Sequence, residues 1–128
     1  MELLLDAHAL IWWLAGDARL PRHVRDAIDK DRARVFVSAA SAWEIATKVR
    51  IGKLPGAAAI AGDILRVVLK EGFKPLAVTI EHGQRAGALP GPLRDPFDRM
   101  LIAQAILEDL HLVSIEHAFD AYGVLRLW

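Results

Sequence analysis

Carboxylates placed directly after apolar runs are the residues of this 128-residue chain most able to do chemistry. Asp6 ends the run Leu3–Leu5, and Glu44 follows the run Val35–Ser38 after a short loop of small residues. Other acids lie beside later apolar runs: Glu81, Asp95, Asp98 and Glu116. Carboxylates gathered in one place repel one another and raise one another's pKa, unless a divalent cation lies among them. The pattern therefore indicates a Mg²⁺ or Mn²⁺ site.

Glu44 also has ordinary structural interpretations. Ser41 and Glu44 have the spacing of a capping box, in which Glu44 would reach back to the start of a helix. Lys48 lies four residues after Glu44 and could pair with it on a helix surface, a contact worth a few tenths of a kcal/mol. Alternatively, Lys48 belongs with Arg50 and Lys53 to a basic stretch that could contact phosphates.

The remaining acids differ in how readily helix capping explains them. Asp95 is typical of an N-cap before a helix that starts at Pro96, and Asp98 in the first turn would complement the helix dipole. Glu81 also falls in a first helical turn. Asp6 is the strongest functional candidate, because an acid that ends an apolar strand is costly to bury alone.

The elements that must position these acids are predicted from periodicity. Short apolar runs alternate with helical segments, which predicts an α/β sandwich: one domain over residues 1–128, with a mostly parallel sheet of four or five strands flanked by helices. Strands are expected at Leu3–Leu5, Val35–Ser38, Pro75–Val78, Leu112–Ile115 and Val124–Leu127. Helices are expected to begin near His8, Pro21, Ala42, Ala57, Ile80 and Pro96. Since sites in such sheets form at the carboxyl ends of strands, several acids should converge there.

Composition and missing motifs exclude several classes of protein. Sixteen Lys and Arg balance sixteen Asp and Glu, so no global charge indicates nucleic acid or membrane binding. The chain has no cysteine, which excludes disulfides and thiolate zinc sites. It also lacks the serine-hydrolase elbow, the P-loop and the dinucleotide fingerprint. No apolar run resembles a signal peptide or a membrane span, so we expect a cytoplasmic protein.

Four segments of the chain together form a recognisable pattern. They are Leu3–Leu14, Ser38–Leu54, Arg94–Ala105 and Leu112–Glu116. Through them the chain resembles the PIN-domain family, and more narrowly the VapC-type toxins of prokaryotic toxin–antitoxin pairs. The resemblance covers nearly the whole chain.

The resemblance implies a metal-dependent endoribonuclease that leaves a 5′-phosphate and a 3′-hydroxyl. By matching position, four acids would be catalytic and hold one or two Mg²⁺ or Mn²⁺ ions: Asp6, Glu44, Asp98 and Glu116. Two residues would support them: Asp95 and Ser114. Three basic residues would contact the RNA backbone: Lys48, Lys53 and Arg99. A cognate antitoxin and a homodimer are further implied, with the antitoxin docking on apolar surface near Trp12, Trp13 and Trp43.

The chain departs from the family pattern at two positions of the site. Ala7 stands where the family usually has Thr or Ser, which removes a hydroxyl. Glu116 stands where Asp is usual, and Asp120 could replace it if a helical turn presents that side chain. These departures keep two alternatives open: a catalytically silent PIN-fold binding module, and an aspartate-based phosphotransfer enzyme that uses Asp6.

Overall fold

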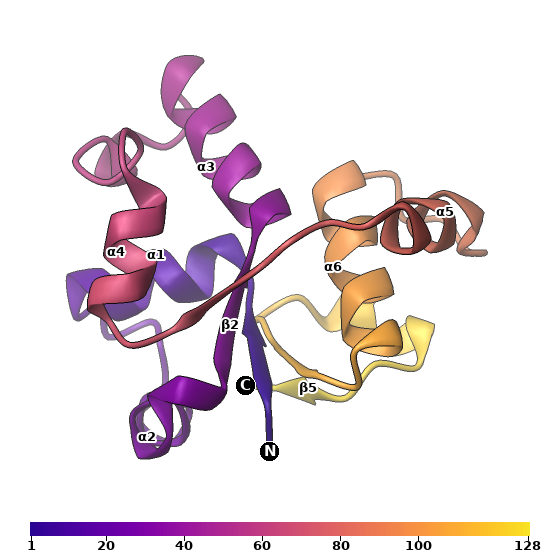
Figure 1. Cartoon of the computed structure of the whole chain (residues 1–128), viewed down its shortest axis with the longest axis horizontal. Helices are drawn as coiled ribbons and strands as arrows, with labels where there is room; N and C mark the ends of the chain where they lie inside the picture. Colours follow the sequence, from indigo (N-terminus) through magenta and orange to yellow (C-terminus); the bar gives the residue numbers. More distant parts are fainter.

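A five-stranded parallel sheet forms the centre of the computed structural model, which describes residues 1–128 (Figure 1). The strands are β1 (Leu3–Leu5), β2 (Val35–Ser38), β3 (Lys74–Leu76), β4 (His111–Val113) and β5 (Arg126–Leu127). Their order is β3-β2-β1-β4-β5, and every neighbouring pair is parallel. The predicted sheet is thus confirmed, although β3 and β4 each begin one residue earlier than predicted and end two residues earlier.

Helices cover both faces of this sheet, as the predicted sandwich requires. The α-helices are α1 (Ala7–Ala15), α2 (Arg22–Lys30), α3 (Ala39–Arg50), α4 (Ile64–Lys70), α5 (Ile80–Ala88) and α6 (Pro96–Leu107). Short 3₁₀ helices are η1 (Arg32–Arg34), η2 (Pro55–Ala57) and η3 (His117–Tyr122). Figure 1 shows α1 to α4 on one side of the strands and α5 and α6 on the other. None of the helices is both long enough and apolar enough to cross a membrane.

Two helix starts differ from those predicted. α3 begins at Ala39, where the Ser38 hydroxyl accepts the Ala40 N–H at 3.0 Å, so the capping box that begins at Ser41 is wrong. Ser41 is instead buried inside the helix, and its Oγ has no hydrogen-bond partner.

The helix expected near Ala57 is only the 3₁₀ turn η2. α4 begins later, at Ile64, where Asp63 caps the Arg66 N–H at 3.2 Å. Gly56 and Gly62 lie in the intervening segment, and glycine disfavours a helix by about 1 kcal/mol relative to alanine.

Each of the three central strands, β2, β1 and β4, faces two different cores, because side chains alternate across a sheet. Leu3 and Leu5 of β1 pack into the larger core, on the side of α1 to α4. Leu4 between them packs into the smaller core with Leu101 and Ile102 of α6. This burial on both faces explains why β1 reads as a continuous apolar run, and it holds the carboxyl end of β1 in place.

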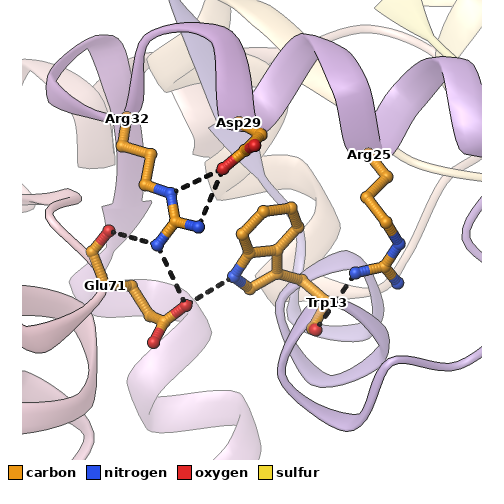
Figure 2. A network of polar contacts seen from close by, with 5 residues as sticks. All are labelled: Trp13, Arg25, Asp29, Arg32 and Glu71. Carbon is orange, nitrogen blue, oxygen red and sulfur yellow. Dashed lines mark hydrogen bonds and ion pairs between the residues drawn. The ribbon is translucent and has the colours of Figure 1, made fainter.

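A network around Trp13 ties α1, α2 and α4 together (Figure 2). The indole Nε1 donates to Glu71 Oε1 at 2.8 Å, and Arg32 bonds both Asp29 and the Glu71 carbonyl. The guanidinium groups of Arg25 and Arg32 lie 5.3 and 5.1 Å from the Trp13 ring centroid. Such cation–π contacts suit a ring that is mostly covered.

Trp12 and Trp13 are therefore not available as a docking surface. Both are buried, with 9% and 8% of their surface exposed, whereas Trp43 is 63% exposed. The prediction of exposed tryptophans was wrong for the first two, because α1 is apolar on nearly all sides and periodicity could not separate its buried face.

Candidate functional site

An acidic cavity of about 100 Å³ lies at the carboxyl edge of the sheet. Five carboxylates line it: Asp6, Glu44, Asp95, Asp98 and Glu116. Ala7, His8 and Lys48 complete the lining. The structure thus brings together all four acids implied as metal ligands, together with the supporting Asp95, whereas Glu81 lies elsewhere at the exposed start of α5.

Asp6 connects β1 to α1 and is buried at the cavity. Its Oδ1 accepts the Ala9 N–H at 2.8 Å, so it caps α1 while its second oxygen remains for other contacts. Burial raises the pKa of Asp6 to about 6. The Ser114 hydroxyl, the Ala9 N–H and the nearby His8 charge each lower it, but less than burial raises it.

Glu44 is buried on α3 and pairs with Lys48 one turn later. Lys48 Nζ lies 2.5 Å from Glu44 Oε2, so the i, i+4 pair expected from the spacing is present. Partial burial lowers the pKa of Lys48, but the hydrogen bond and the surrounding carboxylates raise it more. Lys53, by contrast, is exposed beyond the end of α3, and its side chain makes no hydrogen bond or ion pair.

Asp95 and Asp98 come from the first turn of α6. Asp95 Oδ1 accepts the N–H groups of Phe97 and Asp98 at 2.8 and 3.2 Å, and Pro96 is the first helical residue, as predicted. This cap directs the start of the helix toward the cavity and places the two carboxylates side by side.

Burial and the charges of neighbouring acids both act on the carboxylate of Asp98. Burial raises its pKa most, and the charges of Asp95, Glu44, Asp6 and Glu116 raise it further, to about 7. The site therefore lacks the positive charge needed to neutralise its acids.

Ser114 links the two acids that follow the central strands. It is fully buried after β4, its hydroxyl accepts the Glu116 N–H at 3.0 Å, and the same hydroxyl lowers the pKa of Asp6. Ser114 thus supplies a hydroxyl inside a site where Ala7 has none. Glu116 lies at the exposed rim of the cavity.

Asp120 does not reach the cavity. Its carboxylate accepts two hydrogen bonds from Arg126, at 2.8 and 3.0 Å, and this pairing lowers its pKa. Of the two alternatives for the fourth acid, the structure places Glu116 in the cavity and Asp120 in a separate ion pair.

Arg99, which the sequence suggested as an RNA contact, makes its hydrogen bonds within the protein. Its guanidinium donates to backbone carbonyls of Ala86 at 2.9 Å, Leu93 at 2.8 Å and Leu89. A longer contact of 3.5 Å reaches the Gly87 carbonyl. The side chain fastens the end of α5 and the following loop to α6, which leaves little of it for a phosphate.

His8 is a cavity residue that the sequence did not single out. It lines the site two residues after Asp6, and its ring centroid lies 5.5 Å from that of Trp12. The only feature of the sequence that could have placed His8 in the cavity is its position in the first helical turn after the strand.

The acids that line the cavity fit a hard divalent cation, because all of them are carboxylates and the chain has no thiolate. In the conformation described, no group of three His, Asp or Glu side chains forms a ready-made metal cluster. Lys48 holds one of the acids, Glu44. Binding an ion thus requires small movements of these side chains within the cavity.

An apolar groove of about 460 Å³ lies beside α3 and α6. Trp43 and Phe97 form part of its wall, with their rings edge to face and 4.8 Å between centroids. Val78 lines the same groove, and Ile80 nearby along the chain is 91% exposed. Exposed apolar surface of this kind is typical of a site for another macromolecule.

One protein family matches nearly the whole chain. The family model described as "PIN domain" matches residues 3–125. Ribonuclease VapC16 of Mycobacterium tuberculosis is 36% identical over 81 residues. That match covers 58% of this chain and 57% of the relative, so the chain spans a little over half the length of this curated protein.

Two solved structures share the fold over the whole chain. One is the DNA-bound VapBC complex of Salmonella typhimurium, with a TM-score of 0.67, 17% identity, and coverage of 100% of this chain and 97% of that chain. The other is VapBC2 of Rickettsia felis bound to a fragment of its promoter, with a TM-score of 0.66, 16% identity, and coverage of 100% and 98%. At these identities the likeness establishes the parallel sheet and its helical layers.

Proposed function

Because the chain belongs to the PIN domain family, we propose that it is a metal-dependent endoribonuclease and the toxin of a type II toxin–antitoxin pair. The observation that carries this proposal is the acidic cavity at the carboxyl edge of the sheet, where Asp6, Glu44 and Asp98 meet with too little positive charge to neutralise them. The curated relative, named as a ribonuclease, supports the assignment of RNA as substrate.

Each residue of the cavity has a role in this proposal. Asp6, Glu44, Asp98 and Glu116 would hold Mg²⁺ or Mn²⁺, which when bound activates water and neutralises charge on the phosphodiester. Asp95 and Ser114 would support these acids: Asp95 fixes the start of α6, and Ser114 orients Asp6.

Cleavage of total RNA by the purified chain tests the function. With Mg²⁺ or Mn²⁺ we expect discrete fragments carrying 5′-phosphates, and none with EDTA or with Asp6→Asn. Asparagine can still accept the Ala9 N–H, so this variant should keep the fold while losing a charge. Fragments that persist in Asp6→Asn would overturn the site assignment.

A silent binding module remains the second candidate, because Ala7 and Glu116 depart from the usual pattern. Metal binding to the folded chain without cleavage of any RNA would favour it. Transfer of a phosphoryl group to Asp6 from a small phosphodonor would instead favour the phosphotransfer alternative.

We also propose an antitoxin as the protein partner, in the cytoplasm where RNA is translated. The two matching structures are complexes named VapBC, and the groove at Trp43 and Phe97 offers apolar surface near the acidic cavity. Co-expression with the antitoxin should yield a stable complex, and Trp43→Ser should weaken it. Light scattering of the free chain tests the expected homodimer.

A further inference from the structure

The pairing of Lys48 with Glu44 is unusual for an i, i+4 contact, because it lies inside the acidic cavity. The Glu44 side chain is only 6% exposed, while that of Lys48 is 28% exposed. A buried carboxylate is costly without a partner, so the ammonium stabilises Glu44 when nothing else does. Apart from His8, Lys48 is the only basic residue that lines the cavity.

One ammonium cannot neutralise five carboxylates. Asp95 and Asp98 lie in the same cavity, and Asp98 has no hydrogen bond from a basic side chain. A divalent cation placed among these acids would supply the missing charge and would also need an oxygen of Glu44. The same carboxylate would then have two positive partners, and these repel each other at short distance.

Lys48 can leave the cavity without disturbing the fold. Its flexible four-carbon stem is anchored on a surface turn of α3 and is partly open to solvent. An ammonium displaced from Glu44 would remain at the mouth of the cavity, where the backbone of an RNA strand must pass to reach the acids. There it would meet a phosphate rather than a carboxylate.

We propose that Lys48 and the catalytic cation compete for Glu44, so that arrival of the cation moves the Lys48 ammonium from Glu44 onto the RNA phosphate. This inference rests on the proposed function and adds to it an order of events: the site accepts its metal first and only then presents a cation to the substrate. Lys48 is in this view a positioning residue for RNA and a brake on metal binding.

Metal affinity without RNA is the first test. Calorimetric titration of the whole chain with Mn²⁺ should show about tenfold tighter binding by Lys48→Met than by the wild type, because Glu44 no longer has a competing partner. Lys70→Met is the matched control: Lys70 is an exposed lysine in the last turn of α4, its side chain has no ion pair, and it does not line the cavity. We expect its Mn²⁺ affinity to equal that of the wild type.

The wild-type chain offers a second test that needs no variant. In a ¹⁵N spectrum of the lysine ammonium groups, the bond to Glu44 should protect the Lys48 hydrogens from exchange with water, so that Lys48 gives a visible signal. Saturating Mg²⁺ should abolish that protection. With RNA, Lys48→Met should raise KM about tenfold and leave kcat much less affected, because it weakens phosphate binding rather than the reacting centre.

The outcomes separate this inference from the function on which it rests. Equal or weaker Mn²⁺ binding by Lys48→Met, or a Lys48 signal that stays protected at saturating Mg²⁺, would overturn the competition while leaving the metal site intact. A wild-type chain that binds no Mn²⁺ would overturn the metal site itself, and the competition with it.

Discussion

Asp98 makes the stability of the folded chain depend on pH. Burial and the neighbouring acids raise its pKa to about 7 from the ordinary 3.8. Between these values the folded chain holds a proton at Asp98 that the unfolded chain has released. The free energy of unfolding therefore falls as pH rises through this interval. Asp6, with a pKa raised to about 6, acts in the same direction.

We predict that Asp98→Asn stabilises the metal-free chain at high pH. In EDTA the variant and the wild type should unfold alike below about pH 4, and the variant should become the more stable as pH rises from there to about 7. At pH 8 it should be more stable by on the order of 1 kcal/mol, a value reduced for the solvent that reaches Asp98. Urea unfolding at several pH values measures the difference. A stability difference that did not change with pH would contradict the charge repulsion. In saturating Mn²⁺ the wild type should become the more stable of the two.

Glu116 and Asp120 provide a matched comparison for the fourth ligand. Glu116 lines the cavity, whereas Asp120 pairs with Arg126. We predict that Glu116→Gln lowers the cleavage rate roughly 10- to 100-fold, in the range seen when groups around a metal are altered. Asp120→Asn should change the rate less than twofold. The reverse order would show that η3 rearranges when metal binds.

The sequence could identify these acids but not all of their neighbours. Asp6, Asp95 and Asp98 were predictable because each follows a strand or starts a helix. Asp95 caps α6 as predicted, whereas the bond from the Ala9 N–H that makes Asp6 the cap of α1 was not predicted. Arg99 was not predictable, since its partners are carbonyls 6 to 13 residues away that only the fold brings near. Lys48 allowed two interpretations, and the structure confirms the ion pair.

The loop between α5 and α6 depends on Arg99 and Tyr122. Arg99 binds carbonyls at the end of α5, and the Tyr122 hydroxyl accepts the Leu93 N–H at 2.9 Å. Gly91 approaches the same hydroxyl so closely that an added Cβ would lie 2.6 Å from it, and its φ of 98° also favours glycine. The loop leads directly into Asp95, so its rigidity bears on the acidic cavity.

We predict that Arg99→Lys destabilises the chain by about 1–3 kcal/mol, because one ammonium cannot satisfy carbonyls that a planar guanidinium reaches together. Thermal unfolding measures the loss. Arg85→Met, at an exposed arginine of α5 that makes no side-chain bond, should change stability by less than about 0.5 kcal/mol. If Arg99→Lys left stability unchanged and weakened RNA binding, the result would instead support the predicted contact of Arg99 with an RNA phosphate.

Helices were harder to place than strands, for physical reasons. Ser38 and Ser41 are both good caps, and the alanine-rich segment between them favours a helix from either start. In the structure Ser38, at the end of β2, makes the cap, and Ser41 lies inside the helix with no hydrogen bond from its hydroxyl. The strands could be predicted because burial on both faces leaves short, continuous apolar runs such as Leu3–Leu5.

Metal binding should stabilise the entire fold, since the proposed ligands come from both ends of the chain and from both helical layers. We predict that Mn²⁺ at 100 times its dissociation constant adds about 2.7 kcal/mol to the free energy of unfolding. Thermal unfolding at pH 7.5 with and without Mn²⁺ measures this. The gain should shrink below pH 6, where protons occupy Asp98 and Asp6. Asp6→Asn should lose most of it, and an equal gain in that variant would place the ion elsewhere.

The central strand has a consequence for how the chain is made on the ribosome. β1 pairs on one side with β2 and on the other with β4, where Leu3 of β1 lies opposite His111 of β4. A nascent chain that has emerged only as far as α6 therefore has Asp6 but neither Ser114 nor Glu116, and one edge of β1 is still open. Synthesis must therefore pass residue 116 before the five acids of the cavity can come together, and a fragment released earlier would lack the complete set.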